Sequence, residues 1–321
     1  MLKVVFISRM PVAGAPWETM KCLKKYADMD VRWICDHDGY PDGRKFPADL
    51  VLSPSNKAEC LQLIANADIV HIHCDHPFQD SDFAGKKLIV QHHSVPKRGT
   101  YEMYKKLGGD YYTVSQPWLM REYSDLPHLP NLMDVEEHVP AVRSNEKPVV
   151  AFAPSNNWKI GMVGSRGKTE VDYILQKFGD QIETRSIVGV PYLRNLEMKR
   201  SSDILIDDVV GDTFHKTTLE GCCFGLAVIT SWESDGWAYS NLSSLPDTLR
   251  ELVQNRARLE DLQRKSREWI LNEWHPRDLV KEYVDAYSKL MDGKPKGTLC
   301  YPGGNSRERE SELKGVLHEQ S

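Results

Sequence analysis

Residues 203–230, DILIDDVVGDTFHKTTLEGCCFGLAVIT, decide the fold of this 321-residue chain. DILID is an apolar run of strand length, VVGDTF is a loop, HKTTLEGCCF has the length of a helix, and LAVIT is a second, β-branched strand. A parallel strand–helix–strand unit places the loop and the amino end of the helix at the carboxyl edge of the sheet, where ligands of open α/β sheets bind. The stretch therefore predicts an α/β protein with a ligand site at that edge.

Two acidic residues flank the expected start of the helix. Asp212 stands where the helix should begin, and Glu220 follows eight residues later. The unpaired amides and positive dipole end of a helix suit a phosphate group. The two carboxylates suit the hydroxyl groups of a sugar or ribose. The alternative is that Asp212 only caps the helix and that Glu220 is a solvated helix residue.

The same stretch resembles the donor-binding signature of the retaining GT-B glycosyltransferases of family four. That signature is Glu, seven residues, Glu, then small residues and Gly-x-Pro-Val-Val. Asp212 stands at the first Glu, Phe214 at the aromatic that follows, Glu220 at the second Glu and Gly225 at the glycine. The resemblance implies a GT-B fold, in which two Rossmann-like α/β domains face each other across a cleft and the C-terminal helix crosses back to the first domain.

Three positions depart from the family pattern. Asp212 is one methylene shorter than Glu, His215 replaces a glycine at which the backbone approaches the donor, and Ala227 replaces the proline. The His215 departure places a side chain in space that a diphosphate would use. The resemblance implies that Asp212 contacts the transferred sugar and Glu220 the ribose, and that Thr213, Phe214 and His215 lie at the donor.

Length and composition fit two domains of a globular protein. A net charge of −5 argues against a chain that coats nucleic acid. No apolar run approaches the ~20 residues that span a bilayer, and the N-terminus does not have the form of a signal peptide. Seven cysteines without a C-x-x-C pair favour reduced thiols. We therefore expect a cytoplasmic protein, with a peripheral position at a membrane as the alternative.

The chain opens with a strand over residues 2–8, a turn that holds Gly14, a helix over 19–27 and a strand over 31–36. The turn lacks G-x-G-x-x-G, which argues against a nicotinamide site. In GT-B enzymes this first loop lies over the cleft, and AGAPWE looks like the version of bacterial and phage-type members. The resemblance thus places Gly14 beside the donor phosphates; the alternative is a plain turn glycine.

Histidines follow two of the expected strands. His71 and His73 alternate along the strand in 67–78, and His92 and His93 end the next strand. Zinc is conceivable at the first pair, but the spacing of a metal site is absent, and neither Asp-x-Asp sequence, at 28–30 or 36–38, suits a metal. We expect no metal. In the family a histidine after the later strand lies beside the donor sugar, so the resemblance implies that His93, or His92 as the alternative, touches the sugar.

The second half carries candidate cations for a diphosphate. In the family an Arg and a Lys, often within Lys-Gly-Thr, neutralise the donor diphosphate. Here Arg166 and Lys168 lie in RGKT, with the first two residues of that motif exchanged. A fixed cation would stabilise the negative charge that builds on the leaving diphosphate. The alternative for both residues is surface charge.

Domain bounds follow from composition and from a second family motif. LPNLMD, at 129–134, resembles the Ile-Pro-Asn-Gly-Val-Asp stretch that closes the first domain, with Leu132 in place of the glycine. We expect an N-terminal, acceptor-side domain, a polar linker, a donor-binding domain, a crossover helix and a flexible tail. The expected bounds are 1–140, 141–148, 149–275, 276–292 and 293–321.

The resemblance implies a glycosyltransferase that transfers a sugar from a nucleotide-sugar donor to an acceptor with retention at the anomeric carbon. No cofactor is expected beyond the donor, for which a UDP-sugar is the first choice. The basic segment 86–106 is either a solvated face or a surface for an anionic acceptor, such as a lipid-linked group, a polymer or nucleic acid. The alternatives are a sugar-nucleotide epimerase of the same fold and a non-catalytic nucleotide-sugar-binding protein. Donor sugar, acceptor identity and oligomeric state are not determined by the sequence.

Overall fold

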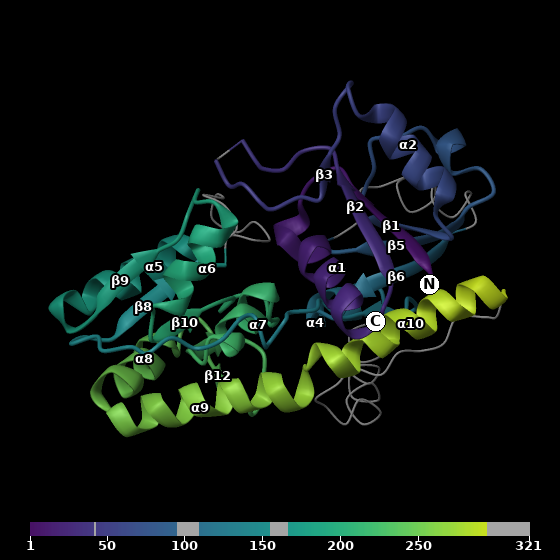
Figure 1. Cartoon of the computed structure of the whole chain (residues 1–321). Coiled ribbons are helices and arrows are strands. Elements are labelled where there is room, and N and C mark those ends of the chain that lie inside the picture. The colour runs from purple at the N-terminus through teal and green to yellow at the C-terminus, as the bar shows by residue number, and fades with distance from the viewer. Residues whose placement is uncertain (42, 95–108, 155–165, 294–321) are drawn as a thin grey trace, which may run out of the picture.

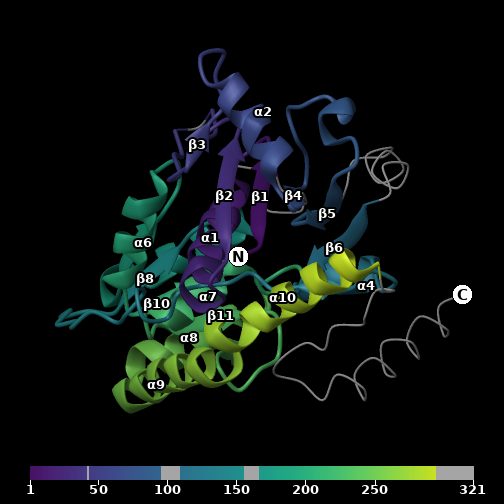
Figure 2. The ribbon, with the colours of Figure 1, turned by 45° about the vertical axis from the view of Figure 1, so that its right-hand side comes forward.

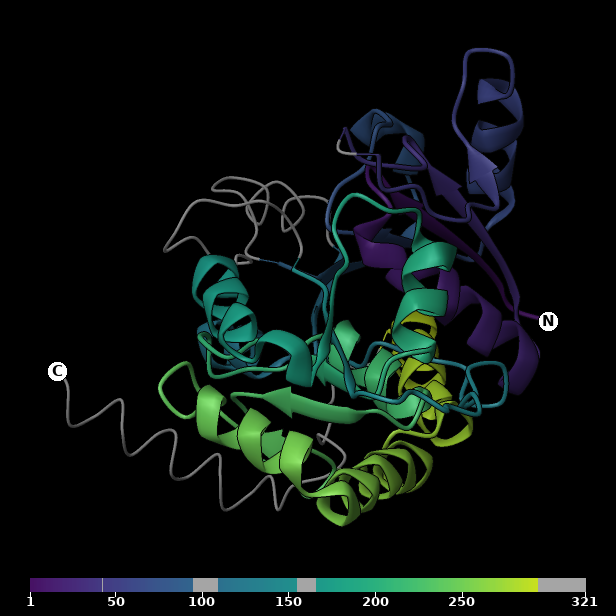
Figure 3. The same cartoon turned by 90° about the vertical axis from the view of Figure 1, so that its left-hand side faces the viewer.

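A computed structural model describes residues 1–41, 43–94, 109–154 and 166–293. The chain forms two α/β halves, each built around one sheet (Figures 1 and 3). All strands pair in parallel. The first sheet has the order β3-β2-β1-β4-β5-β6-β7 and the second the order β12-β11-β10-β8-β9. The prediction of two Rossmann-like domains is therefore confirmed.

The strands of the first sheet are β1 Lys3–Ser8, β2 Asp30–Cys35, β3 Leu50–Val51, β4 Ile69–His73, β5 Lys87–His92, β6 Asp110–Val114 and β7 His128–Leu129. Those of the second are β8 Val149–Phe152, β9 Glu183–Ser186, β10 Ile204–Ile206, β11 Ala227–Thr230 and β12 Ala238–Tyr239. The α-helices are α1 Ala15–Tyr26, α2 Lys57–Asn66, α4 Pro117–Glu122, α5 Lys168–Lys177, α6 Tyr192–Arg200, α7 Lys216–Cys223, α8 Leu245–Gln254, α9 Arg256–Glu273 and α10 Pro276–Asp292. Short 3₁₀ turns are η1 Val12–Gly14, η2 Asp80–Phe83 and η3 Gly179–Gln181.

The central strand β1 shows why an uninterrupted apolar run forms this sheet. Successive side chains of a strand point to opposite faces, and here both faces are covered. Phe6 packs into the core beneath α1 and α10, whereas Ile7 packs into the core beneath α2. Both are fully buried. The sheet is thus fixed in place by apolar packing on two sides, and its carboxyl edge is left for polar residues.

One helix cap and one helix boundary differ from the expected ones. The helix after β10 begins at Lys216 with His215 as its N-cap, so Asp212 does not cap it. His215 instead donates its backbone N–H to Asp207 Oδ2 at 2.8 Å. The apolar spacing over 245–274 predicts one long helix, but the structure has two, α8 and α9. The Asn255 side chain accepts the Arg258 N–H at 3.0 Å and starts the second one.

The C-terminal helix crosses back onto the first domain, as predicted. Figure 2 shows α10 following α9 and running beneath β6. Trp274 donates to the Asn131 carbonyl at 2.8 Å, Tyr283 donates to the Pro130 carbonyl at 2.8 Å, and Tyr287 lies 2.9 Å from His71 Nδ1. The expected tail, 293–321, lies outside the described residues except for Gly293. None of the described helices has the length and apolar character needed to cross a membrane.

Candidate functional site

A cavity of about 480 Å³ lies between the two domains. Residues that follow β1 and β5 line it from the first domain, and residues around β8, α6 and α7 line it from the second. Four of the predicted site residues are among those lining it: His93, Arg166, His215 and Glu220. The carboxyl edges of two parallel sheets therefore contribute to one site, which is where ligands of open α/β sheets bind.

Glu220 is buried on α7 and is held by two lysines. Lys216, one turn earlier on the same helix, donates to Oε1 at 2.7 Å, and Lys199 of α6 donates to Oε2. Burial acts to raise the pKa of Glu220, but the charges of Lys199 and Lys216 outweigh it and lower that pKa to about 2. Glu220 is therefore a fixed anion, not the solvated helix residue of the alternative reading.

The Glu220 group extends to the first domain through Tyr192. Lys216 Nζ donates to the Tyr192 hydroxyl at 2.5 Å, and that hydroxyl donates to Glu18 Oε1 of α1 at 3.4 Å. Both acids are almost fully buried. Buried charges are tolerated only when they are paired and hydrogen-bonded. The chain of contacts thus ties α6 and α7 of the second domain to α1 of the first.

Arg166 lies beside this group with a left-handed backbone, at φ 52°. Its Nη1 donates to Asp207 Oδ1 at the end of β10 and to Thr217 Oγ1 at 3.1 Å. Arg166 is 8% exposed, yet its Nε–H has no partner among the described residues. An arginine fixed by a buried aspartate, with one buried donor still unused, is poised for an oxygen of a ligand.

His215 lines the cavity, and its side chain is held by a neighbouring acid. Its imidazole turns onto Asp208, with Nε2 3.1 Å from Oδ2. Burial acts to raise the pKa of Asp208, but the hydrogen bond with His215 and two backbone N–H donors, of Val210 and Gly211, lower it to about 2. The His215 side chain, which stands where the family pattern has a glycine, thus lines the cavity and is held by Asp208.

His93 lines the first-domain side of the cavity, and its Nε2 lies 2.9 Å from His73 Nδ1. Burial lowers the pKa of His93 to about 3 and that of His92 to about 4. His92 is 1% exposed and stacks on Tyr111, away from the lining residues. Of the two candidates that the sequence left open, His93 is the one at the cavity.

Gly14 lies at the start of α1 with φ +74°, and its neighbours Ala13 and Ala15 line the cavity. A Cβ added there would lie 3.2 Å from Phe46 Cδ1 and 3.4 Å from the Tyr192 ring. Both the left-handed backbone and the close approach favour glycine. Gly14 thus does more than make a turn, because it lets the first loop pack against the second domain.

The other predicted residues do not line the cavity as far as the structure describes it. Lys168 starts α5 and pairs with Asp172 one turn later. Asp212, with an exposed side chain, pairs with Arg121 of α4 at 2.6 Å. Phe214 is 1% exposed and packs against Trp237 and Trp274, and Thr213 is buried next to it. Their predicted donor contacts remain predictions.

Sequence reasoning missed several residues at the cavity. Lys216 could have been found, because it lies four residues before Glu220 and so shares its helix face. Lys199 gives no such signal, since it is 21 residues from Glu220 and meets it only through packing of α6 on α7. Asn131 lies within the LPNLMD motif, and its buried Oδ1 has no partner in the described part of the chain.

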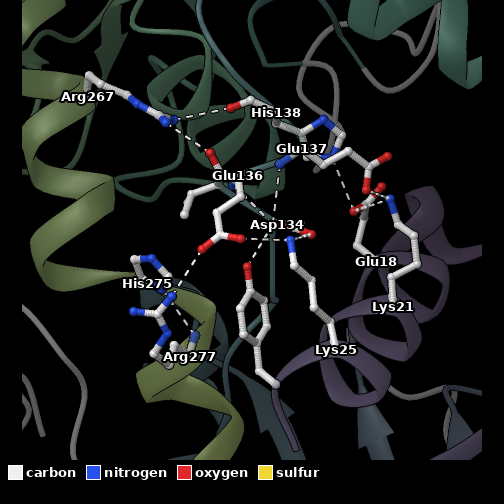
Figure 4. A network of polar contacts seen from close by, with 12 residues as sticks. Glu18, Lys21, Lys25, Asp134, Glu136, Glu137, His138, Arg267, His275 and Arg277 are labelled. Carbon is white, nitrogen blue, oxygen red and sulfur yellow. Dashed lines mark hydrogen bonds and ion pairs between the residues drawn. The ribbon is translucent and has the colours of Figure 1, made fainter.

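Figure 4 shows the polar network where the chain leaves the first domain. Glu18, Glu137 and His138 offer ligand atoms within 4.8 Å of one another, an arrangement that a metal could use. Lys21 Nζ already lies 2.6 Å from Glu137 and 3.2 Å from Glu18. Because an ammonium group balances these carboxylates, the network fits a structural joint between α1 and the segment after β7 better than a metal site.

The histidines considered for zinc have other partners. His71 contacts Tyr287, and His73 contacts His93. The six cysteines within the described residues are free thiols. Of the lysines and arginines in the basic segment 86–106, only Lys86 and Lys87 lie within the described residues. Lys86 donates to the Ala67 carbonyl at 3.0 Å, close to the end of α2, which is a structural contact.

Solved structures with this arrangement of domains are known, although no family model and no curated protein matches the sequence. Sucrose-phosphate synthase from Thermosynechococcus elongatus superposes with a TM-score of 0.57 at 9% identity, over 92% of this chain and 100% of that one. WaaG, a glycosyltransferase involved in lipopolysaccharide biosynthesis, gives 0.50 at 12%, over 89% of this chain and 99% of that one. With its two parallel sheets and crossover helix, the chain has the GT-B fold.

Proposed function

We propose that this protein is a glycosyltransferase that takes a nucleotide-sugar donor and transfers the sugar with retention. The observation that carries the proposal is the cation-rich amino end of α7, which opens on the cavity between the domains. Lys216 and Thr217 of its first turn line the cavity, and no described side chain caps the helix. The amides of Lys216 and Thr217 and the positive dipole end of the helix can bind phosphate, whereas the Thr218 amide donates to the His215 carbonyl at 3.0 Å. Arg166 adds its unused Nε–H from the side.

Glu220 can still accept a ribose hydroxyl. A carboxylate has about four acceptor positions on its two oxygens, and the lysines use one on each oxygen. With a pKa of about 2 it is ionised at neutral pH. The resulting site presents amides and cations to a diphosphate and an anion to hydroxyl groups. Those are the complementary groups of a nucleotide sugar, and a UDP-sugar is the first donor to test.

We infer retention from the family resemblance, and the low pKa values of two groups at the cavity fit it. Transfer with inversion needs a general base whose pKa lies near neutral pH. Glu220 is the one carboxylate among the described residues that line the cavity, and its pKa is about 2. His93 has a pKa of about 3. Both are poor bases, which fits a front-face mechanism in which the leaving diphosphate itself accepts the proton of the acceptor. That the acceptor is anionic remains a prediction, which a transfer assay with charged and neutral acceptors tests.

The first test is thermal stabilisation by UDP, UDP-sugars and other nucleotide sugars. A ligand at one hundred times its dissociation constant adds ~2.7 kcal/mol to the free energy of unfolding. Lys216→Met should weaken binding of the stabilising nucleotide by about tenfold or more, because a charged hydrogen bond is lost. Arg194→Met is the matched control: Arg194 lies on α6, is exposed and pairs with Glu197.

Transfer itself is followed by NMR of the anomeric proton, with the stabilising donor and a panel of charged and neutral acceptors. We expect a product with the anomeric configuration of the donor. An inverted product would overturn retention. Interconversion of donor sugars without any acceptor would replace the transferase by an epimerase. If the donor binds but no acceptor of the panel is glycosylated, the protein is a non-catalytic nucleotide-sugar-binding protein.

A further inference from the structure

Three histidines form a row from the crossover helix to the cavity. Tyr287 of α10 contacts His71 Nδ1, the rings of His71 and His73 stack at 4.4 Å and 7°, and His73 Nδ1 lies 2.9 Å from His93 Nε2. We call His71, His73 and His93 the histidine row. His71 and His73 are fully buried in β4, with Phe6 edge-on against both rings. The ring of His73 therefore has a fixed plane and a fixed position.

The contact between His73 and His93 has two possible directions. Either His73 Nδ1–H donates to His93 Nε2, or His93 Nε2–H donates to His73 Nδ1. The far nitrogen of His73, Nε2, is buried and has no partner among the described residues. In the second arrangement that nitrogen would carry a buried N–H without an acceptor. Orphaned N–H groups are rarer in proteins than unfilled acceptors, so the first arrangement is favoured.

The direction of this contact also decides the tautomer of His93. If Nε2 accepts from His73, the neutral ring of His93 must carry its hydrogen on Nδ1. Asn131 lines the same cavity and is 5% exposed. Burial is the main cause that lowers the pKa of His93, and a hydrogen bond with the Asn131 side chain acts in the opposite direction.

We propose that His73 is a positioning residue, which fixes His93 as the Nδ1–H tautomer and so makes it a hydrogen-bond donor at the cavity. His93 then donates to an oxygen of the ligand and does not act as a general base, because one nitrogen already carries a proton and the other already accepts one. This role deepens the proposed function and rests on it for the identity of the ligand oxygen, a hydroxyl of the donor sugar. The tautomer itself does not depend on that function.

The test compares substitutions of His73 that keep or remove the donor. His73→Asn places an amide near the position of Nδ1 and can still donate to His93 Nε2. His73→Leu removes the donor at similar volume. His128→Asn is the matched control, because His128 lies in the same sheet with a buried, unpartnered Nε2 and does not line the cavity.

The first readout is the tautomer of His93, from long-range proton–nitrogen NMR of the ¹⁵N-histidine-labelled full chain at pH 7, with the His93 signals assigned by His93→Gln. We expect Nδ1–H in wild type, in His73→Asn and in the His128→Asn control, and loss of the pure Nδ1–H pattern in His73→Leu. An Nε2–H tautomer in wild type, or an unchanged His93 in a folded His73→Leu, would overturn the proposal.

The second readout is binding affinity, and it distinguishes contacts with the sugar from contacts with the nucleotide. In His73→Leu the affinity for the UDP-sugar should fall by about tenfold relative to that for UDP, because UDP lacks the sugar hydroxyl. His73→Asn should restore most of the difference. Equal losses for both ligands would overturn the link to the sugar. If no nucleotide binds wild type while the tautomer is as expected, the proposed function fails and the positioning of His93 stands.

Discussion

The two sides of the cavity bury polar groups in opposite ways. On the first-domain side, the histidine row is buried without counter-charges, and burial lowers the pKa of His71 to about 3. On the second-domain side, an ionic cluster of Arg166, Asp207, Lys199, Lys216 and Glu220 is buried with every charge paired. The first side offers neutral donors, and the second offers fixed charges. A ligand with a neutral sugar and a charged diphosphate matches this division.

Lowering the pH should produce the largest loss in the free energy of unfolding. The loss should come from the neutral histidines on the first-domain side of the cavity. His71, His73 and His92 have folded-state pKa values far below 6.5, so their full contribution to stability is present above pH 6.5 and is lost as the pH falls toward those values. Between pH 6.5 and 5 each loses about 1.6 kcal/mol, or about 5 kcal/mol together. Urea unfolding at pH 7, 6 and 5 measures the loss.

The acidic groups on the second-domain side should not change the free energy of unfolding between pH 6.5 and 5. Glu220 and Asp208 have pKa values of about 2, so their contributions are present above the unfolded values and fade only as the pH drops below about 4. A free energy of unfolding that is flat from pH 7 to 5 would break the comparison, because the histidines would then not be buried as neutral groups.

Removing one charge from the ionic cluster should give the next largest effect. Glu220→Gln leaves Lys199 and Lys216 buried without their anion, and we expect a loss of about 3–5 kcal/mol in urea unfolding at pH 7. The control, Glu197→Gln, breaks an exposed pair with Arg194 and should change stability by less than about 0.5 kcal/mol. Equal effects of the two substitutions would mean that the cluster is open to solvent.

A single neutral contact should matter less. Tyr287→Phe removes the hydroxyl that contacts His71 Nδ1 at the far end of the histidine row. We expect a loss of about 1 kcal/mol in the free energy of unfolding, the value of one buried hydrogen bond. The tautomer of His93 should stay unchanged, because the contact of His71 with His73 is ring stacking. A switch of the His93 tautomer would show that the row acts as one connected hydrogen-bond chain.

The smallest effect is expected where the two domains meet at the surface. Asp212 and Arg121 form an exposed pair between the domains, so a double-mutant cycle of Asp212→Asn and Arg121→Ala should give a coupling of about 0.5 kcal/mol or less. Turnover of the two single variants tests whether Asp212 also has a role in sugar transfer. If Asp212 contacts the transferred sugar, Asp212→Asn lowers turnover far more than Arg121→Ala does. Equal losses would assign Asp212 to holding the domains together.

Much of the fold was predictable because its signals are local. Buried parallel strands read as short apolar runs, as in residues 2–8 and 203–207, and their pairing follows from the α/β alternation. The helix predicted over 215–224 is α7, but Asp212 does not cap it, because His215 is the N-cap and donates its amide to Asp207. Asn255 restarts a helix within 245–274 for a similarly local reason that the apolar pattern did not show.

The sequence by itself determined two α/β domains, the crossover helix and the edge at which polar residues gather. Only the tertiary structure decided the state of those residues. Glu220 is held by a lysine 21 residues away, and His93 by a histidine 20 residues away. A pKa or a tautomer depends on every group within a few ångströms and on the exclusion of water. Those neighbours come from separate segments of the chain, so no local pattern contains them.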